Sequence, residues 1–88
     1  MRKTFTVVVH EAEEGGYWGE CLELECASQG EDLDEMDRNI RESIEAVLAV
    51  RLDDGDDIAA IKKAPEVEIS PTDRKWEISI ALPTPVAA

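Results

Sequence analysis

The chain has 88 residues, 43% of them hydrophobic, and its 21 acidic and 9 basic side chains give a formal net charge of −12. This length predicts one domain over residues 1–88, and the hydrophobic content is too high for an intrinsically disordered chain. The negative charge argues against direct nucleic-acid binding, which depends on lysine and arginine, and favours a basic partner. Because so short a chain buries only a thin core, we also expect a homo-oligomer.

No stretch approaches the roughly 20 apolar residues that span a bilayer, and the N-terminal apolar run is too short for an export signal. The sequence therefore predicts no membrane segment. Cys21 and Cys26 are the only cysteines. Without an export signal we expect them to be reduced thiols, which predicts a cytoplasmic protein.

Three strands are predicted in the first third of the chain. Residues 3–10 are rich in β-branched side chains and alternate, with Phe5, Val7 and Val9 on one face. Residues 13–16 end in two glycines and predict a hairpin turn into a second strand, residues 17–22. A bend at residues 23–25 leads into a short third strand within residues 24–30.

A long helix is predicted over residues 33–51, roughly 28 Å in length at 1.5 Å per residue. Asp32 and Glu35 have the spacing of a capping box, which marks the helix start. A single apolar stripe follows at helical spacing and predicts the buried face. It consists of Leu33, Met36, Ile40, Ile44, Val47 and Leu48.

The last third of the chain is less regular. The acidic run at residues 53–57 ends the helix, and residues 58–64 have room for a further helical turn. Residues 66–70, between two prolines, are interpreted as an edge segment. Residues 74–82 alternate strictly and predict a half-buried strand whose apolar side packs on the helix stripe. The expected fold is thus α+β, in the order β-β-β-α-β, an antiparallel-rich sheet with one long helix on one face.

No residue pattern predicts catalysis or metal binding. His10, the only histidine, is most simply a polar strand residue. Cys21 and Cys26 lack the spacing of a zinc or redox pair. Aligning Gly55 with the glycine of a calcium-binding EF-hand loop puts Val50 and Ile61 at ligand positions, so that motif fails. We expect no cofactor and no enzymatic activity.

One charge pattern does point to a partner. Between Glu11 and Asp37 there are eleven acidic residues and no lysine or arginine. Such a segment attracts a basic surface and accelerates encounter with it, although a merely solubilising surface is an equal alternative on physical grounds. The candidate partner-binding residues are Glu13, Glu14, Glu20, Glu23, Glu25 and Asp32.

Residues 3–50 contain, in order, a GGY turn, an acidic cysteine-containing strand, a short strand ending in Ser-Gln-Gly, and an acidic helix start. With these features the segment resembles the N-terminal domain of HicB antitoxin-like proteins. The matching positions are Gly15, Gly16, Tyr17, Glu20, Leu24, Ser28, Gln29, Gly30, Leu33, Glu35, Asn39, Ile40 and Ile44. The resemblance implies a partial ribonuclease H-like fold and binding to HicA, a small basic RNA-cleaving toxin.

Two departures from the HicB pattern qualify what the resemblance implies. The family commonly has Pro-x-Leu-Pro-Gly between its second and third strands, whereas here Leu22 to Glu25 run straight into Cys26. Family members also often carry a C-terminal DNA-binding module, and we expect none here. The leading hypothesis is a non-enzymatic domain that sequesters a HicA-like toxin. The alternative is a stand-alone, self-associating scaffold domain without a toxin partner.

Overall fold

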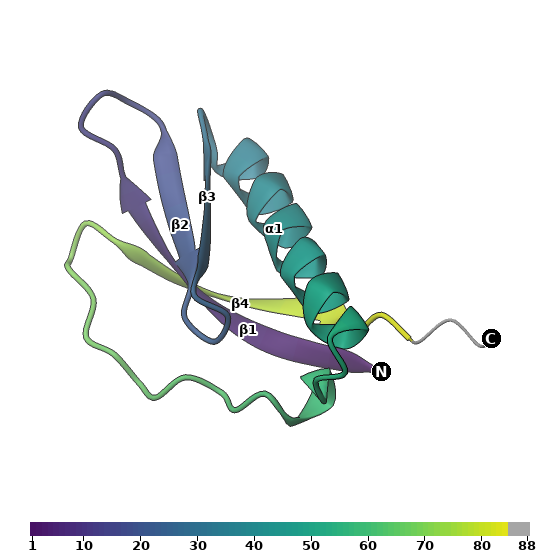
Figure 1. The fold of residues 1–88 in the computed structure, drawn as a ribbon. Coiled ribbons are helices and arrows are strands. Elements are labelled where there is room, and N and C mark those ends of the chain that lie inside the picture. Colours follow the sequence, from purple (N-terminus) through teal and green to yellow (C-terminus); the bar gives the residue numbers. More distant parts are fainter. Residues whose placement is uncertain (85–88) are drawn as a thin grey trace.

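The computed structural model describes residues 1–84 as a four-stranded sheet with one long helix, in the order β-β-β-α-β (Figure 1). This arrangement confirms the predicted α+β class. The ends of the strands and of the helix lie within two residues of the predicted ones. The elements are β1 (Arg2–Glu11), β2 (Tyr17–Cys21), β3 (Cys26–Gly30), α1 (Leu33–Asp53), the 3₁₀ helix η1 (Ile58–Ala60) and β4 (Arg74–Ala81).

The strands lie in the order β3-β2-β1-β4, and every neighbouring pair is antiparallel. Strand β1 is rich in β-branched residues, which suits its position between β2 and β4, where side chains on both of its faces are buried. In the register, Val9 of β1 lies opposite Gly19 of β2, and Phe5 lies opposite Ile78 of β4. The first and last strands of the chain are therefore adjacent.

The core lies between α1 and one face of the sheet (Figure 1). Helix α1 packs mainly on β3 and β2, and β4, whose apolar side was predicted to face the helix, shares the core with α1 but packs on it less extensively. The reason is that α1 begins only two residues after β3 ends and must return alongside it. The fully buried residues of β1 and α1 are Phe5, Val7, Val9, Met36, Ile40, Ile44 and Leu48, and Ile78 and Ile80 of β4 join them.

The outer edge of β3 is covered by side chains of α1. Asn39 Nδ2 donates to the carbonyl oxygen of Gln29 at 2.8 Å, and Ser43 Oγ donates to that of Ala27 at 3.3 Å. These two carbonyls belong to alternate residues of β3 and point away from β2. The helix thus supplies hydrogen-bond donors where a further strand would otherwise pair.

The irregular segment 61–73 runs on the side of the sheet away from α1 (Figure 1) and contacts it through Ala64, which donates to Glu23, and Asp73, which lies against His10. Thr6 and Val8 point to this face and are only 3% and 4% exposed. The helical turn expected within residues 58–64 is confirmed as η1, but residues 66–70 form no strand. Their flanking prolines lack the N–H groups that a ladder needs, and both edges of the sheet lie elsewhere.

Candidate functional site

The hairpin between β1 and β2 lifts two carboxylates to one end of the molecule. Its turn is closed by hydrogen bonds from Ala12 N to Gly16 O and from Gly15 N to Ala12 O, both 3.1 Å. Gly15 and Gly16 have φ values of 98° and 80°, a region that side chains disfavour. Glu13 and Glu14 occupy the remaining turn positions and are exposed.

The start of α1 brings further carboxylates to the same end. Asp32 accepts a hydrogen bond from the Glu35 N–H at 2.8 Å, which confirms the predicted N-cap. Glu35 Oε1 in turn accepts from the backbone N–H of Glu31 at 3.2 Å, one residue before the cap. Both interactions satisfy donors that a helix start leaves free.

Glycines allow these two acidic segments to meet. A Cβ on Gly30 would lie 2.4 Å from the backbone nitrogen of Met36, so only glycine lets α1 begin this close to β3. A Cβ on Gly16 would lie 2.8 Å from the Gly30 carbonyl oxygen, which places the hairpin turn directly against the end of β3. We call the resulting surface the acidic end. It consists of Glu13, Glu14, Glu31, Asp32, Asp34 and Glu35.

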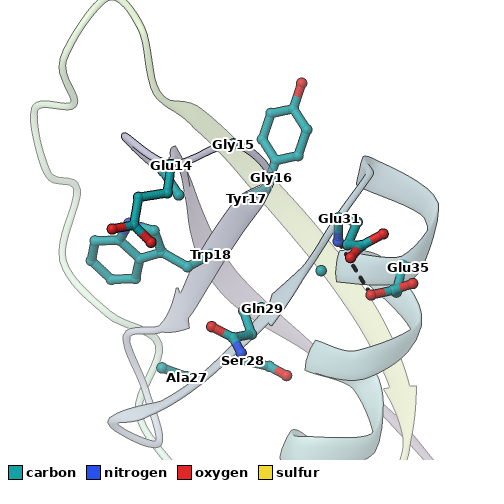
Figure 2. A pocket seen from close by; sticks show the side chains of 12 residues that line it. Glu14, Gly15, Gly16, Tyr17, Trp18, Ala27, Ser28, Gln29, Glu31 and Glu35 are labelled. Carbon is teal, nitrogen blue, oxygen red and sulfur yellow. Dashed lines mark hydrogen bonds between the residues drawn. The ribbon is translucent and has the colours of Figure 1, made fainter.

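A shallow cleft of about 1080 Å³ lies at the acidic end (Figure 2). Glu14 flanks it beside Trp18, and Glu31 and Glu35 flank it from the helix side (Figure 2). Its other lining residues are small, polar or aromatic: Ala12, Gly15, Gly16, Tyr17, Ala27, Ser28, Gln29 and Gly30. Trp18 is 40% exposed, so a flat apolar ring is available next to carboxylates.

A cation from β4 contacts one of the residues that line this cleft. The guanidinium carbon of Arg74 lies 5.5 Å from the centre of the Tyr17 ring, within cation–π range. Tyr17 therefore already shows the type of contact that an incoming arginine would make. The Glu13 and Glu14 carboxylates at the hairpin tip have no hydrogen-bonding or ionic partner within residues 1–84.

The six predicted contact residues do not form one surface. Glu13, Glu14 and Asp32 gather at the acidic end, although the Asp32 carboxylate is used for the helix cap. Glu25 is exposed in the turn between β2 and β3, at the other end of these strands, and lines a smaller hollow there. The remaining two residues, Glu20 and Glu23, have partners inside the chain.

Glu23 is a structural residue in this fold. Its Oε1 accepts from the backbone N–H of Thr6 at 2.7 Å, and its Oε2 accepts from that of Ala64 at 2.9 Å. Burial raises the pKa of Glu23, but the Ala64 and Thr6 N–H groups together outweigh burial, and the pKa lies below its ordinary value. The carboxylate thus joins β1 to the segment that follows η1.

Glu20 belongs to a cluster around His10 on the sheet face away from α1. His10 Nε2 lies 3.4 Å from Glu20 Oε1, and Nδ1 lies 2.9 Å from Asp73 Oδ2. The imidazole also stacks on the Trp18 indole, with ring centres 4.0 Å apart. Sequence reasoning missed this cluster. The hairpin register could have paired His10 with Trp18, but nothing local pointed to Asp73, 63 residues away.

The two cysteines lie opposite each other at the end of the β2–β3 ladder, and both are free thiols. Burial raises the pKa of Cys21 to about 12 and also raises that of Cys26, so neither is poised as a nucleophile. Among residues 1–84, no three or more His, Cys, Asp or Glu side chains are arranged to hold a metal ion. Across the same residues, no helix has the length and hydrophobicity needed to cross a membrane.

Two proteins of Synechocystis sp. are similar to this chain. UPF0150 protein ssr1258 is 39% identical over 64 residues, which cover 70% of this chain and 93% of that protein. UPF0150 protein ssl0738 is 33% identical over 55 residues, which cover 61% of this chain and 76% of that protein. No family model and no solved structure matches the chain. On the strength of its similarity to ssr1258, the chain belongs to the UPF0150 family.

Proposed function

We propose that this chain is a non-enzymatic, HicB-like binding domain that captures a small basic protein at its acidic end. The observation that carries the proposal is the convergence of the hairpin tip and the helix start, two segments of a stretch with eleven acidic and no basic residues. Their carboxylates flank a cleft that also offers aromatic rings. The surface therefore combines long-range electrostatic attraction for a basic protein with a cleft in which lysine or arginine side chains can bind.

Each part of this surface has a separate physical role in capture. The exposed Glu13 and Glu14 carboxylates raise the rate of encounter with a positively charged protein, an effect that falls as salt is added. An arginine or lysine that enters the cleft gains the Glu31 or Glu35 carboxylate on the side of α1, or the Glu14 carboxylate beside Trp18 on the other side. Glu20, Glu23 and Asp32 contribute indirectly, because they hold the strands and helix that present the surface.

The identity proposed for the partner is a HicA-like RNA-cleaving toxin. It rests on the HicB-type motif in residues 3–50, whose GGY turn and Ser-Gln-Gly strand end both line the cleft. Capture of this kind inhibits by covering the toxin and needs no chemistry from the chain. The UPF0150 names of the Synechocystis relatives state no activity.

Binding to the small basic protein encoded beside this chain tests the proposal. Isothermal titration of the two purified proteins should give a complex that weakens steeply with added salt. The triple variant Glu13→Lys, Glu14→Lys and Glu31→Lys should bind at least about a hundredfold more weakly, since each reversed contact near the interface costs on the order of 1 kcal/mol.

A matched control separates site from net charge. Asp56→Lys, Asp57→Lys and Glu66→Lys make the same change in charge at exposed positions beyond α1. Equal weakening by both triple variants would refute the acidic end as the binding surface. Absence of any small basic neighbour that binds the chain would refute the toxin as partner.

A further inference from the structure

Strand β4 has one unpaired edge. It hydrogen-bonds to β1 on one side and to no strand on the other within residues 1–84. Lys75 and Glu77 are exposed and Trp76 between them is half-buried. A strand edge of this kind is a template for pairing with another strand.

The contacts of Thr6 fix which backbone groups of β4 face outward. The Thr6 N–H donates to Glu23 and its carbonyl accepts from the Leu22 N–H at 3.0 Å, so both groups point toward β2. Thr6 lies opposite Glu77, which makes this a non-hydrogen-bonded pair. The N–H and C=O of Glu77 therefore point away from β1, and by alternation so do those of Lys75.

The free edge is limited at one end by arginines. The carbonyl oxygen of Ser79 accepts from Arg2 at 2.8 Å and from Arg41 at 3.3 Å. Asp37 holds the Arg41 guanidinium at 3.2 Å. Ser79 is thus already occupied, and the stretch open to a new strand is centred on residues 75–77.

Charge makes this edge the easiest approach for a second copy. Two chains of net charge −12 repel each other, most strongly at their acidic ends. Around β4 the charges are mixed, because Arg74 and Lys75 lie on the strand and Lys63 pairs with Glu77 at 3.0 Å. A partner of the same sequence meets least repulsion here.

We propose that two copies of this chain associate by antiparallel pairing of their β4 edges about a two-fold axis at Trp76. Residues whose backbone N–H and C=O groups point away from β1 must lie opposite residues of the same kind in the second copy. Because such residues alternate along β4, the two-fold axis must pass through a residue and not between two residues. With the axis at Trp76, Lys75 of each copy lies opposite Glu77 of the other, which gives two hydrogen-bonded pairs of opposite charge. The two Trp76 side chains meet in a close, non-hydrogen-bonded pair.

The neighbouring registers are less favourable. An axis at Lys75 or Glu77 places two like charges directly opposite each other, which is destabilising. An axis at Ile78 pairs Glu77 with Ser79, whose carbonyl the arginines already occupy. The Trp76 register is also the one that covers the exposed part of the indole, and aromatic cross-strand pairs are favourable. The result is a continuous eight-stranded sheet.

Sedimentation velocity of the full chain, from low micromolar to near-millimolar concentration, tests this dimer directly. The unmodified chain should show a concentration-dependent monomer–dimer equilibrium. Lys75→Glu and Glu77→Lys should each weaken the dimer by about tenfold or more, since each places like charges opposite one another twice. The double variant, which exchanges the two residues, should restore it.

Two controls make the outcome specific to this edge. Glu42→Lys, on the exposed face of α1, changes net charge as Glu77→Lys does, and both reduce general repulsion between copies. Only Glu77→Lys should nevertheless weaken the dimer. Glu77→Pro removes an N–H that β1 does not use and should also abolish pairing while circular dichroism shows the fold intact. A strictly monomeric chain, or a dimer unaffected by these edge variants, would overturn the proposal. The measurement needs no toxin partner, so it is independent of the proposed capture function.

Discussion

Replacement of Glu23 by glutamine should destabilise the fold although it changes a single atom. Both carboxylate oxygens accept a backbone N–H, from Thr6 at 2.7 Å and from Ala64 at 2.9 Å. Glutamine keeps one acceptor and turns an NH₂ group toward the other donor. A hydrogen bond to a charged group contributes about 1.5–3 kcal/mol, so we expect a loss of about 2 kcal/mol.

Urea unfolding followed by circular dichroism measures this loss. The midpoint should fall while its slope stays constant, and in a thermal scan about 2 kcal/mol corresponds to roughly 8–16 °C for a chain of this size. Glu25→Gln is the matched control, because Glu25 is exposed in the same turn and its side chain has no partner among residues 1–84. Equal stability of the two variants would refute the assigned role of Glu23.

The pH dependence gives a second check with a definite sign. The pKa of Glu23 is lowered in the folded state, so its contribution is complete above the unfolded-state value of about 4.3 and is lost as pH falls through the folded value. The stability difference between the unmodified chain and Glu23→Gln should therefore be full at neutral pH and shrink in acid. A difference that stays constant in strong acid would mean that the ionised carboxylate is not responsible.

Three further predictions concern the turn, the helix start and the thiols. Gly30→Ala should lower the free energy of unfolding in urea by about 3 kcal/mol, because the new Cβ would collide with the α1 backbone. In Gly15→Ala the new Cβ meets no atom, so the loss should be only about 1 kcal/mol, for the positive φ. Equal losses would contradict the close approach of α1 to Gly30. Asp32→Ala should cost about 1 kcal/mol through loss of the N-cap, and Asp34→Ala, in the same helical turn, only a few tenths. Burial raises the pKa of the Cys21 thiol to about 12, so at pH 8 it should react with iodoacetamide far more slowly in the folded chain than in urea. Mass spectrometry measures both rates. Similar rates would contradict the burial of Cys21.

Local patterns predicted the elements well. Alternation in residues 74–82, the Gly-Gly turn and the Asp32 cap each depend on neighbours a few residues away, and each is confirmed. The burial of both faces of β1 was less evident. Thr6 is polar, and its backbone N–H finds its partner in the side chain of Glu23, 17 residues further along the chain.

Long-range contacts account for what the sequence did not reveal. In the sequence Glu23 looks like the other acidic residues of its segment, and only the fold shows that it accepts a hydrogen bond from Ala64. Likewise, His10 looks like a polar strand residue, and only the fold shows its contact with Asp73. The acidic end was predictable in part, because the charge count marked Glu13, Glu14 and Asp32. Their neighbours Glu31 and Glu35 were separable from Glu20 and Glu25 only once the fold had placed them.

The covering of β3 by Asn39 and Ser43 determines how any assembly through this sheet would grow. A sheet with two free edges can add copies head to tail without limit, which leads to fibres. Here α1 supplies donors to the β3 carbonyls, and within residues 1–84 only the β4 edge remains available. Strand addition between copies would therefore be self-limiting: once two β4 edges have met, the described part of the chain offers no edge for a third.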